Sequence, residues 1–171
     1  MAGEKSPVTF GAPWGRSLKI VSLLMAALMI GLTGAGVLNA DLAPAAKLPL
    51  LILPIVLVVG TAAFMVLGYR ISNRTLIIQR PGWTTRVPLT NLQSAVSNPN
   101  VMSSSIRIFG NGGMFSFTGL FWNKALGRYR AYVTDLQRTV VLKMTDRTIV
   151  ISPETPDLFI EELRKHSALA T

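Results

Sequence analysis

Two long stretches without a charged residue lie in the first half of this chain, from Ile20 to Ala40 and from Leu48 to Gly68. A helix needs about 20 consecutive apolar residues to cross the hydrocarbon core of a bilayer, and both stretches reach that length. A buried helix of a soluble protein is rarely apolar on every side over so many residues, and here two such stretches follow one another. We therefore predict a hairpin of two membrane-spanning helices at residues 18–68, with the helices at about 18–40 and 48–68.

Small residues recur at four-residue intervals in the first stretch, at Ala27, Gly31 and Ala35. This spacing places them on one face of a helix, where small side chains allow the backbone of a second helix to approach closely. The second stretch offers Gly60 and Ala63. We expect the two helices to pack against each other through these residues.

Basic residues beside the two stretches predict the orientation in the membrane, because short loops rich in Lys and Arg stay in the cytoplasm. The flanking residues are Lys5, Arg16 and Lys19 before the hairpin and Arg70, Arg74, Arg80 and Arg86 after it. The connection between the helices contains only Lys47. We therefore predict a multi-pass protein of the plasma (inner) membrane with both termini in the cytoplasm.

Residues 1–17 are predicted to form a flexible tail, because Gly11, Pro13 and Gly15 interrupt them. Trp14 in this tail suits an anchor at the headgroup level, and an ordinary exposed aromatic residue is the alternative. A cleavable signal peptide is the alternative to a retained first helix. Its apolar core usually has about 7 to 15 residues, which is shorter than the run from Ile20 to Ala40, so we favour retention.

The chain after Gly68 changes from a continuous apolar pattern to an alternating one, with turn residues such as Pro81-Gly82 at short intervals. Alternation with a period of two is typical of β-strands that are buried on one face. We predict strands at 69–71, 75–79, 86–89, 105–109, 129–134, 139–144 and 148–151, and residues 92–96 remain open between strand and loop. Pro88 predicts an edge position for its strand, since proline cannot donate to a neighbour.

A helix is predicted at about residues 156–166, because Thr155 can cap it and Pro156 and Asp157 suit its first turn. Its apolar stripe consists of Phe159, Ile160 and Leu163. A helix of this kind can cover the open end of a small sheet. We therefore expect residues 69–171 to form a cytoplasmic antiparallel β-barrel or sandwich of about seven strands with a C-terminal helix as its cap.

Several phrases of the second half carry a resemblance to a known family. They are Tyr69-Arg70-Ile71, Val87-Pro88-Leu89, the residues 109–115 and 119–123, Leu126-Gly127, and the residues 131–135 and 149–153. In this order they resemble a bacterial pleckstrin-homology-like domain of the type that follows two membrane helices. The resemblance covers Tyr69 to His166, and the string from Phe109 to Asp135 is its most specific part.

This resemblance implies a bent barrel of seven strands capped by the terminal helix, and it implies no activity. Eukaryotic pleckstrin-homology domains often bind phosphoinositides through basic residues in the loop between their first two strands. Here that loop is Ser72-Asn73-Arg74, which is too short and too poor in charge to carry such a site.

No constellation of catalytic or metal-binding residues is apparent. Histidine occurs once, at His166, which we expect on the solvated side of the terminal helix. Asp135 and Asp146 stand alone at strand ends, so no pair suggests acid–base chemistry. Cysteine is absent and no carboxylates stand at ligand spacing, so we expect neither a metal nor a cofactor. Residues 110–113 lack the Lys-Ser/Thr and the helix that follow a phosphate loop, and we predict a β-turn there.

Positive charge is the strongest asymmetry of the second half, with eleven Lys or Arg and two Asp between Arg70 and Arg147. Lys124, Arg128 and Arg130 lie near Trp122 in this segment. Each cation close to an anionic lipid surface contributes about 1 kcal/mol, so this cluster predicts a surface for anionic lipid or for a protein partner. The alternative is that the aromatic residues belong to the core and the arginines form an ordinary solvated strand face.

From these observations we predict a membrane-anchored, non-enzymatic module that docks lipid headgroups or a protein partner at the cytoplasmic face. An accessory subunit of a larger membrane protein assembly is the alternative, in which the spans supply the specificity. Nucleic acid is not expected as a partner, because the sequence contains no recognition motif for it.

Overall fold

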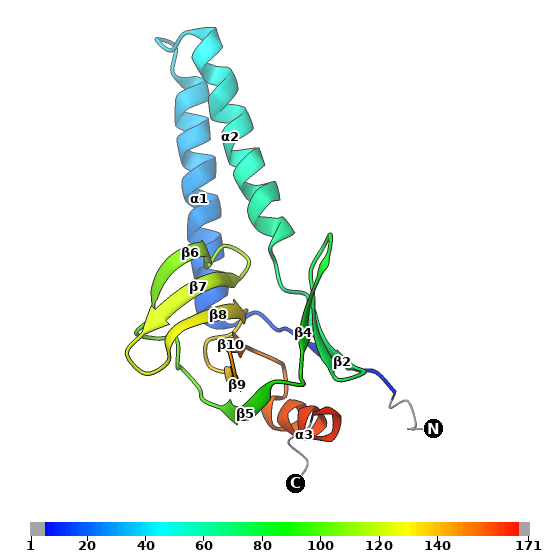
Figure 1. Ribbon diagram of the computed structural model, residues 1–171. Coiled ribbons are helices and arrows are strands. Elements are labelled where there is room, and N and C mark those ends of the chain that lie inside the picture. Colours follow the sequence, from blue (N-terminus) through cyan, green and yellow to red (C-terminus); the bar gives the residue numbers. More distant parts are fainter. Residues whose placement is uncertain (1–5, 168–171) are drawn as a thin grey trace.

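The computed structural model describes residues 6–167, in which a helical hairpin projects from a β-rich domain (Figure 1). The hairpin consists of α1 (Arg16–Leu38) and α2 (Pro44–Ala63). Both helices are long and apolar enough to cross a membrane, and only 6% of the most apolar part of α1 and none of that of α2 is buried. A core helix of a soluble protein would be mostly buried. The hairpin therefore has the surface expected of helices that lie in a bilayer.

Both helices begin and end earlier than predicted, and the difference is larger for α2. Pro44 occupies its first turn, where the missing N–H of proline costs nothing, so α2 starts before the uncharged stretch. The helix ends at Ala63 and the chain turns toward the domain, where Ser116 Oγ donates a hydrogen bond to the Phe64 carbonyl at 3.2 Å. Residues 64–67 therefore connect the hairpin to the domain instead of completing the helix.

The two helices contact each other through a different face from the one predicted. The small residues Ala27, Gly31 and Ala35 are all exposed. Instead, Leu50 of α2 packs so closely on Gly36 that an added Cβ would lie 2.6 Å from its Cδ1, and Thr33 Oγ1 donates a hydrogen bond to the Leu50 carbonyl at 3.3 Å. The prediction is wrong because the spacing of small residues marks a face, whereas the short connection between the helices determines which face meets the partner.

Sheet A has the strand order β1-β2-β3-β4, and all its neighbours are antiparallel. Its strands are β1 (Val8–Gly11), β2 (Gly68–Ser72), β3 (Thr75–Gln79) and β4 (Thr84–Pro88). Pro88 lies on the edge strand β4, as predicted. The prediction of a flexible tail is wrong for β1, which pairs along β2 from Val8–Ile71 to Gly11–Gly68. The tail carries a strand because β2 offers it a free edge, which the local sequence cannot reveal.

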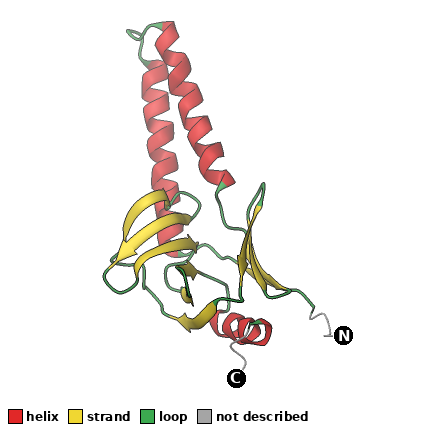
Figure 2. Ribbon diagram, viewed as in Figure 1, coloured by secondary structure: helices red, strands yellow, loops and turns green. Residues whose placement is uncertain are grey.

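Sheet B has the strand order β5-β9-β10-β8-β7-β6. Figure 2 shows the strands of the domain in yellow below the red helical hairpin. Its strands are β5 (Leu92–Ser97), β6 (Ile106–Gly112), β7 (Phe117–Asn123), β8 (Gly127–Val133), β9 (Val140–Met144) and β10 (Thr148–Ile151). β5 shows that residues 92–96 are a strand, and β7 was not predicted. β10 runs parallel to β8, so the wholly antiparallel prediction is wrong. The reason is that the β9–β10 hairpin joins the sheet with β10, not β9, beside β8.

The core lies between the two sheets and is closed at one end by α3 (Pro156–His166), whose bounds agree with the prediction. Sheet A contributes Tyr69, Ile71, Leu76 and Ile78, sheet B contributes Leu142, Ile149 and Ile151, and α3 contributes Phe159 and Leu163. Phe10 of β1 packs edge-on against Phe159, with 5.0 Å between ring centroids. Within residues 6–167 the ten strands therefore form a sandwich and not a closed barrel, and they exceed the predicted seven.

His166 is buried, with 7% of its surface exposed, and its Nδ1 lies 2.9 Å from the Glu162 carbonyl oxygen. The prediction of a solvated histidine is wrong. His166 follows Leu163 by three residues and Phe159 by seven, and these spacings place all three on the same face of a helix. The histidine is thus part of the face that packs on the sheets.

The first turns of α1 are fixed to the domain. Leu18 is fully buried, and Ser22 Oγ donates to the Gly113 carbonyl at 3.2 Å and accepts from the Phe115 N–H at 3.1 Å. Just before the helix, the Gly15 N–H donates to the Thr134 carbonyl at 2.9 Å. The hairpin is therefore a structural extension of the domain and not a loose tether.

Candidate functional site

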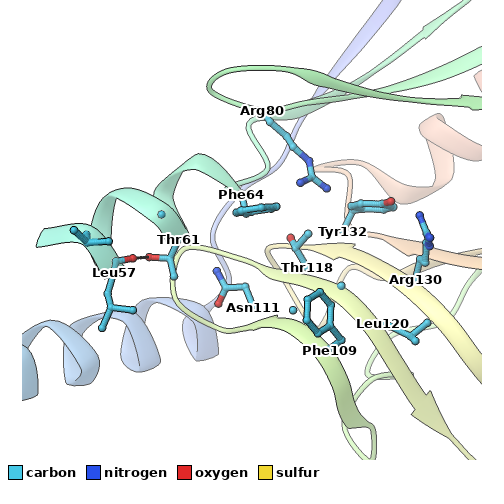
Figure 3. A pocket seen from close by; sticks show the side chains of 14 residues that line it. Leu57, Thr61, Phe64, Arg80, Phe109, Asn111, Thr118, Leu120, Arg130 and Tyr132 are labelled. Atoms are coloured by element: carbon cyan, nitrogen blue, oxygen red, sulfur yellow. Dashed lines mark hydrogen bonds between the residues drawn. The ribbon is translucent and has the colours of Figure 1, made fainter. Parts of the chain in front are cut away.

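A cleft of about 720 Å³ lies between the end of α2 and the strands β6, β7 and β8 (Figure 3). The helix side contributes Val56, Leu57, Gly60, Thr61 and Phe64, the sheet side contributes residues 109–111, 118–120, Arg130 and Tyr132, and Arg80 follows β3. Ligand sites in proteins commonly have volumes of about 300–1,000 Å³. Most of the lining is apolar, and its charged members are two arginines.

The sheet side of the cleft continues the face that sheet A covers elsewhere. Arg130 of β8 is in register with Ile149 of β10, and Ile149 is buried in the core between the sheets. Side chains in register lie on the same face of a sheet. The same face is therefore core at β10 and exposed at β6–β8, beyond the part that sheet A covers (Figure 1).

We call the exposed part of this face the open face, and define it by two rows of paired residues. One row is Ile106, Trp122 and Arg128, and the other is Phe109, Leu120 and Arg130. Phe109 is 78% exposed and Trp122 is 38% exposed. Large apolar side chains on β6 and β7 thus lie beside the two arginines of β8 on the same surface.

Three of the four predicted site residues lie together on the open face. Trp122 and Arg128 are directly opposite each other, and Arg130 lies one pleat further along β8. Lys124 lies in the turn between β7 and β8 and is exposed. Phe121, by contrast, is buried in a second core cluster, so the aromatic residues of this segment divide between core and surface.

Arg80 belongs to the site, although the sequence analysis used it only as one of the basic residues that predict the orientation of the hairpin in the membrane. Its guanidinium carbon lies 5.1 Å from the ring centroid of Tyr132, 5.7 Å from that of Trp83 and 5.8 Å from that of Phe64. Burial lowers the pKa of the guanidinium from its ordinary value, and Tyr132 partly opposes this effect. The backbone turn that holds Arg80 is closed by its own N–H, which donates to the Trp83 carbonyl at 3.1 Å.

The charged groups of the cleft have no acidic partners within the described residues. The ion pairs of residues 6–167 include neither Arg80 nor Arg130. The Nε atom of Arg80 is also buried without a hydrogen-bond partner. A buried donor without an acceptor is uncommon in folded proteins and calls for a physical explanation.

Two glycines form the floor of the cleft where β6 and β7 come close together. Gly110 and Gly119 face each other in register with φ angles of +110° and +141°, a region that other residues rarely adopt. A Cβ on Gly119 would collide with the Phe109 carbonyl oxygen. Residues 110–112 are therefore strand, and the predicted turn starts later, at Gly113. The glycines leave backbone without side chains at the bottom of the cleft.

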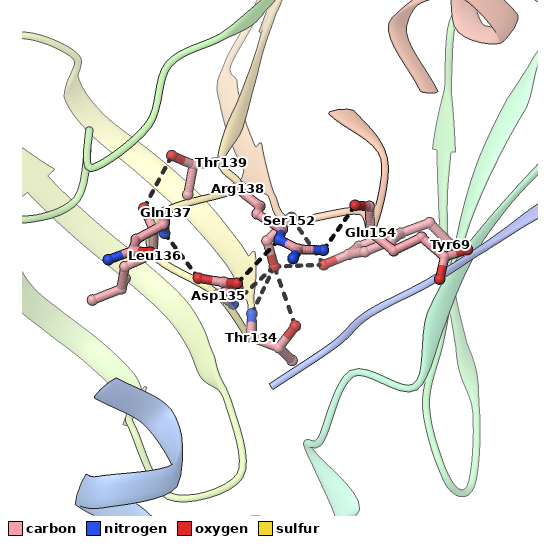
Figure 4. A network of polar contacts seen from close by, with 9 residues as sticks. All are labelled: Tyr69, Thr134, Asp135, Leu136, Gln137, Arg138, Thr139, Ser152 and Glu154. Carbon is pink, nitrogen blue, oxygen red and sulfur yellow. Dashed lines mark hydrogen bonds and ion pairs between the residues drawn. The ribbon is translucent and has the colours of Figure 1, made fainter. Parts of the chain in front are cut away.

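A network of polar groups joins the two sheets where β8 and β10 end (Figure 4). Tyr69 Oη donates to the Tyr132 carbonyl at 2.6 Å and accepts from the Ser152 N–H at 3.0 Å, and Ser152 Oγ accepts from the Thr134 N–H at 2.8 Å. Burial raises the pKa of Tyr69 to about 12, so its hydroxyl stays protonated at neutral pH. The network holds the sheets together and offers no ionisable base to the serine.

The described residues contain no group of three or more His, Asp or Glu that could hold a metal ion. The family model described as "Bacterial PH domain" matches residues 67–167, more than half of the chain, and confirms the resemblance. The matched segment contains β2 to β10 and α3 but neither β1 nor the helical hairpin. No curated protein and no solved structure matches the chain.

Proposed function

We propose, from the premise that this chain belongs to the bacterial PH domain family, that it is a membrane-anchored binding module without catalytic activity. PH domains are generally non-catalytic binding modules. The ligand class that we propose is the anionic lipid headgroup, at the cytoplasmic face of the membrane. The open face, together with Lys124, is the surface that meets it.

The observation that carries this proposal is the chemistry of the open face. Arg128 and Arg130 are exposed beside Trp122 and Phe109, with no acidic residue in either of its two rows. Cations near an anionic leaflet contribute about 1 kcal/mol each, and exposed aromatic rings suit the headgroup layer. Solubility alone gives no reason for the exposure of the Phe109 side chain.

The aromatic residues around the base of the hairpin support a position for the bilayer surface. Beside α1, the ring centroids of Trp14 and Phe115 are 5.8 Å apart. Beside the end of α2, those of Phe64 and Trp83 are 5.2 Å apart. Aromatic rings gather at both interfaces of membrane proteins. We place the headgroups at this level. The cleft then lies at the membrane surface, and Lys124 and Arg128 lie further from it, where they act through the longer-range field of the lipid charges.

The strand β1 supports the predicted membrane topology. It precedes α1 and pairs with β2, which follows α2, so both ends of the hairpin meet in one sheet. Two crossings of the bilayer fit this arrangement, and the flanking arginines favour the cytoplasmic side. Removal of the first helix as a signal peptide would also remove Phe10 and Leu18 from the core, which favours retention.

A protein partner is the second candidate, because β6 ends sheet B as an edge strand with exposed Ile106, Ile108 and Phe109. An unpaired edge with apolar side chains is a surface on which another chain can add a strand. In this case the protein would act as an accessory subunit of a larger membrane assembly.

The test uses the full chain in lipid nanodiscs, since β1 shows that a fragment from residue 69 would lack part of its core. The sequence contains no cysteine, so Ala125→Cys in the β7–β8 turn accepts a single fluorophore beside Lys124. Nitroxide-labelled headgroups should quench it more in discs that contain phosphatidylglycerol than in pure phosphatidylcholine. The difference should vanish at 1 M salt, where the Debye length falls to about 3 Å.

The double variant Lys124→Gln/Arg128→Gln should abolish this difference in quenching. A fluorophore on Thr145→Cys, in the exposed β9–β10 turn, is the control for the effect of the label's position on quenching. Equal quenching in both kinds of disc would contradict the lipid proposal. The second candidate would then be tested by crosslinking and pull-down of the intact protein from its own membrane, with Ile106→Ser and Phe109→Ser as variants that should lose the partner.

A further inference from the structure

We propose that the cleft between α2 and sheet B binds one anionic phospholipid from the bilayer, with its phosphate at Arg80 and Arg130 and an acyl chain along α2. This inference rests on the proposed function and narrows it. The open face would attract the charged surface as a whole, whereas the cleft would hold a single molecule in a defined stoichiometry.

The charge of the cleft fits an anionic group. Among the lining residues, Arg80 and Arg130 are the charged ones, and neither forms an ion pair within residues 6–167. Arg130 precedes Tyr132 by two residues on the same face of β8, a separation of about 7 Å, and Figure 3 shows Arg80 and Arg130 on either side of the Tyr132 ring. Each guanidinium offers several N–H donors to phosphate oxygens.

Arg80 is also held in place before any ligand arrives. Three aromatic rings surround its guanidinium, and Figure 3 shows two of them, Phe64 and Tyr132. Its Nε–H is buried without an acceptor. An arginine fixed in this way loses little conformational freedom on binding, which favours affinity. A phosphate oxygen at the terminal N–H groups of this guanidinium would supply the anionic partner that the described residues do not.

The apolar part of the cleft fits a chain in the bilayer. Val56, Leu57 and Gly60 lie on the last turns of α2, and Val56 is about 12 Å along the helix from Phe64 at its end. The cleft therefore extends from the level of the interfacial aromatic residues into the depth of the hydrocarbon. Gly60 has no neighbour within 4 Å of an added Cβ, so it leaves a groove in the wall. A free phosphate ester would use the arginines and leave this groove empty.

The experiment measures lipid retained by the full chain. The protein is purified in mild detergent, mixed with equal amounts of phosphatidylglycerol and phosphatidylcholine, and analysed by native mass spectrometry. We expect one phosphatidylglycerol per chain and little phosphatidylcholine. Arg80→Gln should lower the retained phosphatidylglycerol at least about tenfold. Arg86→Gln removes the same charge from an exposed position of β4 outside the cleft and should have no effect.

A second pair of variants tests the groove without changing any charge. Gly60→Leu should fill it and reduce retention about as much as Arg80→Gln, and Gly31→Leu is the matched control. Both glycines have open space around an added Cβ, so neither leucine disturbs the packing of the chain, but Gly31 does not line the cleft. Normal retention by Gly60→Leu would overturn the proposed path of the acyl chain, whatever Arg80→Gln does.

The remaining outcomes separate this inference from the proposed function. Equal retention of both lipids, or normal retention by Arg80→Gln, would overturn the cleft site. Full competition by glycerol 1-phosphate would overturn it too, because the ligand would then be a soluble phosphate ester. If Lys124→Gln/Arg128→Gln loses the quenching difference in nanodiscs but keeps its lipid, the cleft binds its lipid without Lys124 and Arg128, as proposed. If the same variant also loses the retained lipid, the open face alone binds lipid and the cleft inference fails.

Discussion

The two halves of the inner face of sheet B follow the same strand geometry but face different surroundings. Over β9 and β10, this face carries residues such as Leu142, Ile149 and Ile151, and sheet A and α3 bury them. Over β6 to β8, the same face is buried only at the row of Thr118 and Tyr132 and is otherwise uncovered, where it carries Phe109, Trp122, Arg128 and Arg130. We call the first half the covered face and keep the name open face for the second.

The difference teaches how a small domain can separate stability from recognition within one sheet. Burial of apolar side chains stabilises the fold in proportion to the area removed from water, and the covered face supplies that area. Exposed charges contribute little to stability, so the open face is free to carry them. If this division is correct, substitutions on the covered side should change the free energy of unfolding, and those on the open face should change binding.

The largest effect is expected from Phe159→Ala, which removes a fully buried ring that packs on Phe10 and Tyr69 over the covered face. Such truncations cost about 3–5 kcal/mol of unfolding free energy, enough to unfold a marginal domain. Leu158→Ala is the matched control, because Leu158 is exposed on the same helix and should change stability by less than about 0.5 kcal/mol. Thermal unfolding of the full chain in detergent measures both, and equal melting temperatures would contradict the role of α3 as the cap.

A smaller effect is expected from the alkaline titration of Tyr69, whose hydroxyl links the sheets. Burial raises its pKa from 10.0 to about 12, so the folded protein keeps a proton that the unfolded chain releases above pH 10. The contribution of this proton to the free energy of unfolding should therefore be fully present below pH 10. The free energy of unfolding should fall by about 2–3 kcal/mol as the pH rises to 12. Tyr69→Phe should flatten this fall. An identical pH profile for parent and variant would show that Tyr69 is not the group that titrates.

The smallest effect on stability is expected on the open face. Lys124→Gln/Arg128→Gln should change the unfolding free energy by less than about 0.5 kcal/mol, because both side chains are exposed and form no ion pair in residues 6–167. The same variant should lose at most about 2 kcal/mol of attraction to anionic lipid, since each cation contributes about 1 kcal/mol at the surface and less at a distance. Chemical unfolding and the nanodisc assay on one preparation compare the two quantities. A large loss of stability would end the distinction between the two faces.

The elements that were predicted correctly are those with strong local signals. The uncharged stretches predict the hairpin, and Pro156 with the stripe of Phe159 and Leu163 predicts α3 to the residue. β1 and β7 were missed for local reasons as well. β1 is only four residues long, and Gly119 interrupts the alternation of β7.

The candidate site was predicted only in part, because its other half depends on contacts between distant segments. Trp122, Arg128 and Arg130 are close in sequence, and their shared face follows from the period of a strand. Arg80 meets Phe64 and Tyr132 only after α2, sheet A and sheet B have come together. No local pattern encodes that meeting, although the turn Arg80-Pro81-Gly82-Trp83 marks where the arginine lies.

The pairing of β1 with β2 also bears on how the protein is made. The ribosome synthesises β1 first, and its partner strand appears only after residues 12–67 have been added. Closing so long a loop in solution carries an entropic cost that grows with its length. Insertion of the hairpin would bring the two ends of that loop to the same spot at the membrane surface. If the hairpin spans the bilayer, as proposed, the bilayer serves as a folding template: the N-terminal strand is held at the point of insertion, and the domain is completed there and not in free solution.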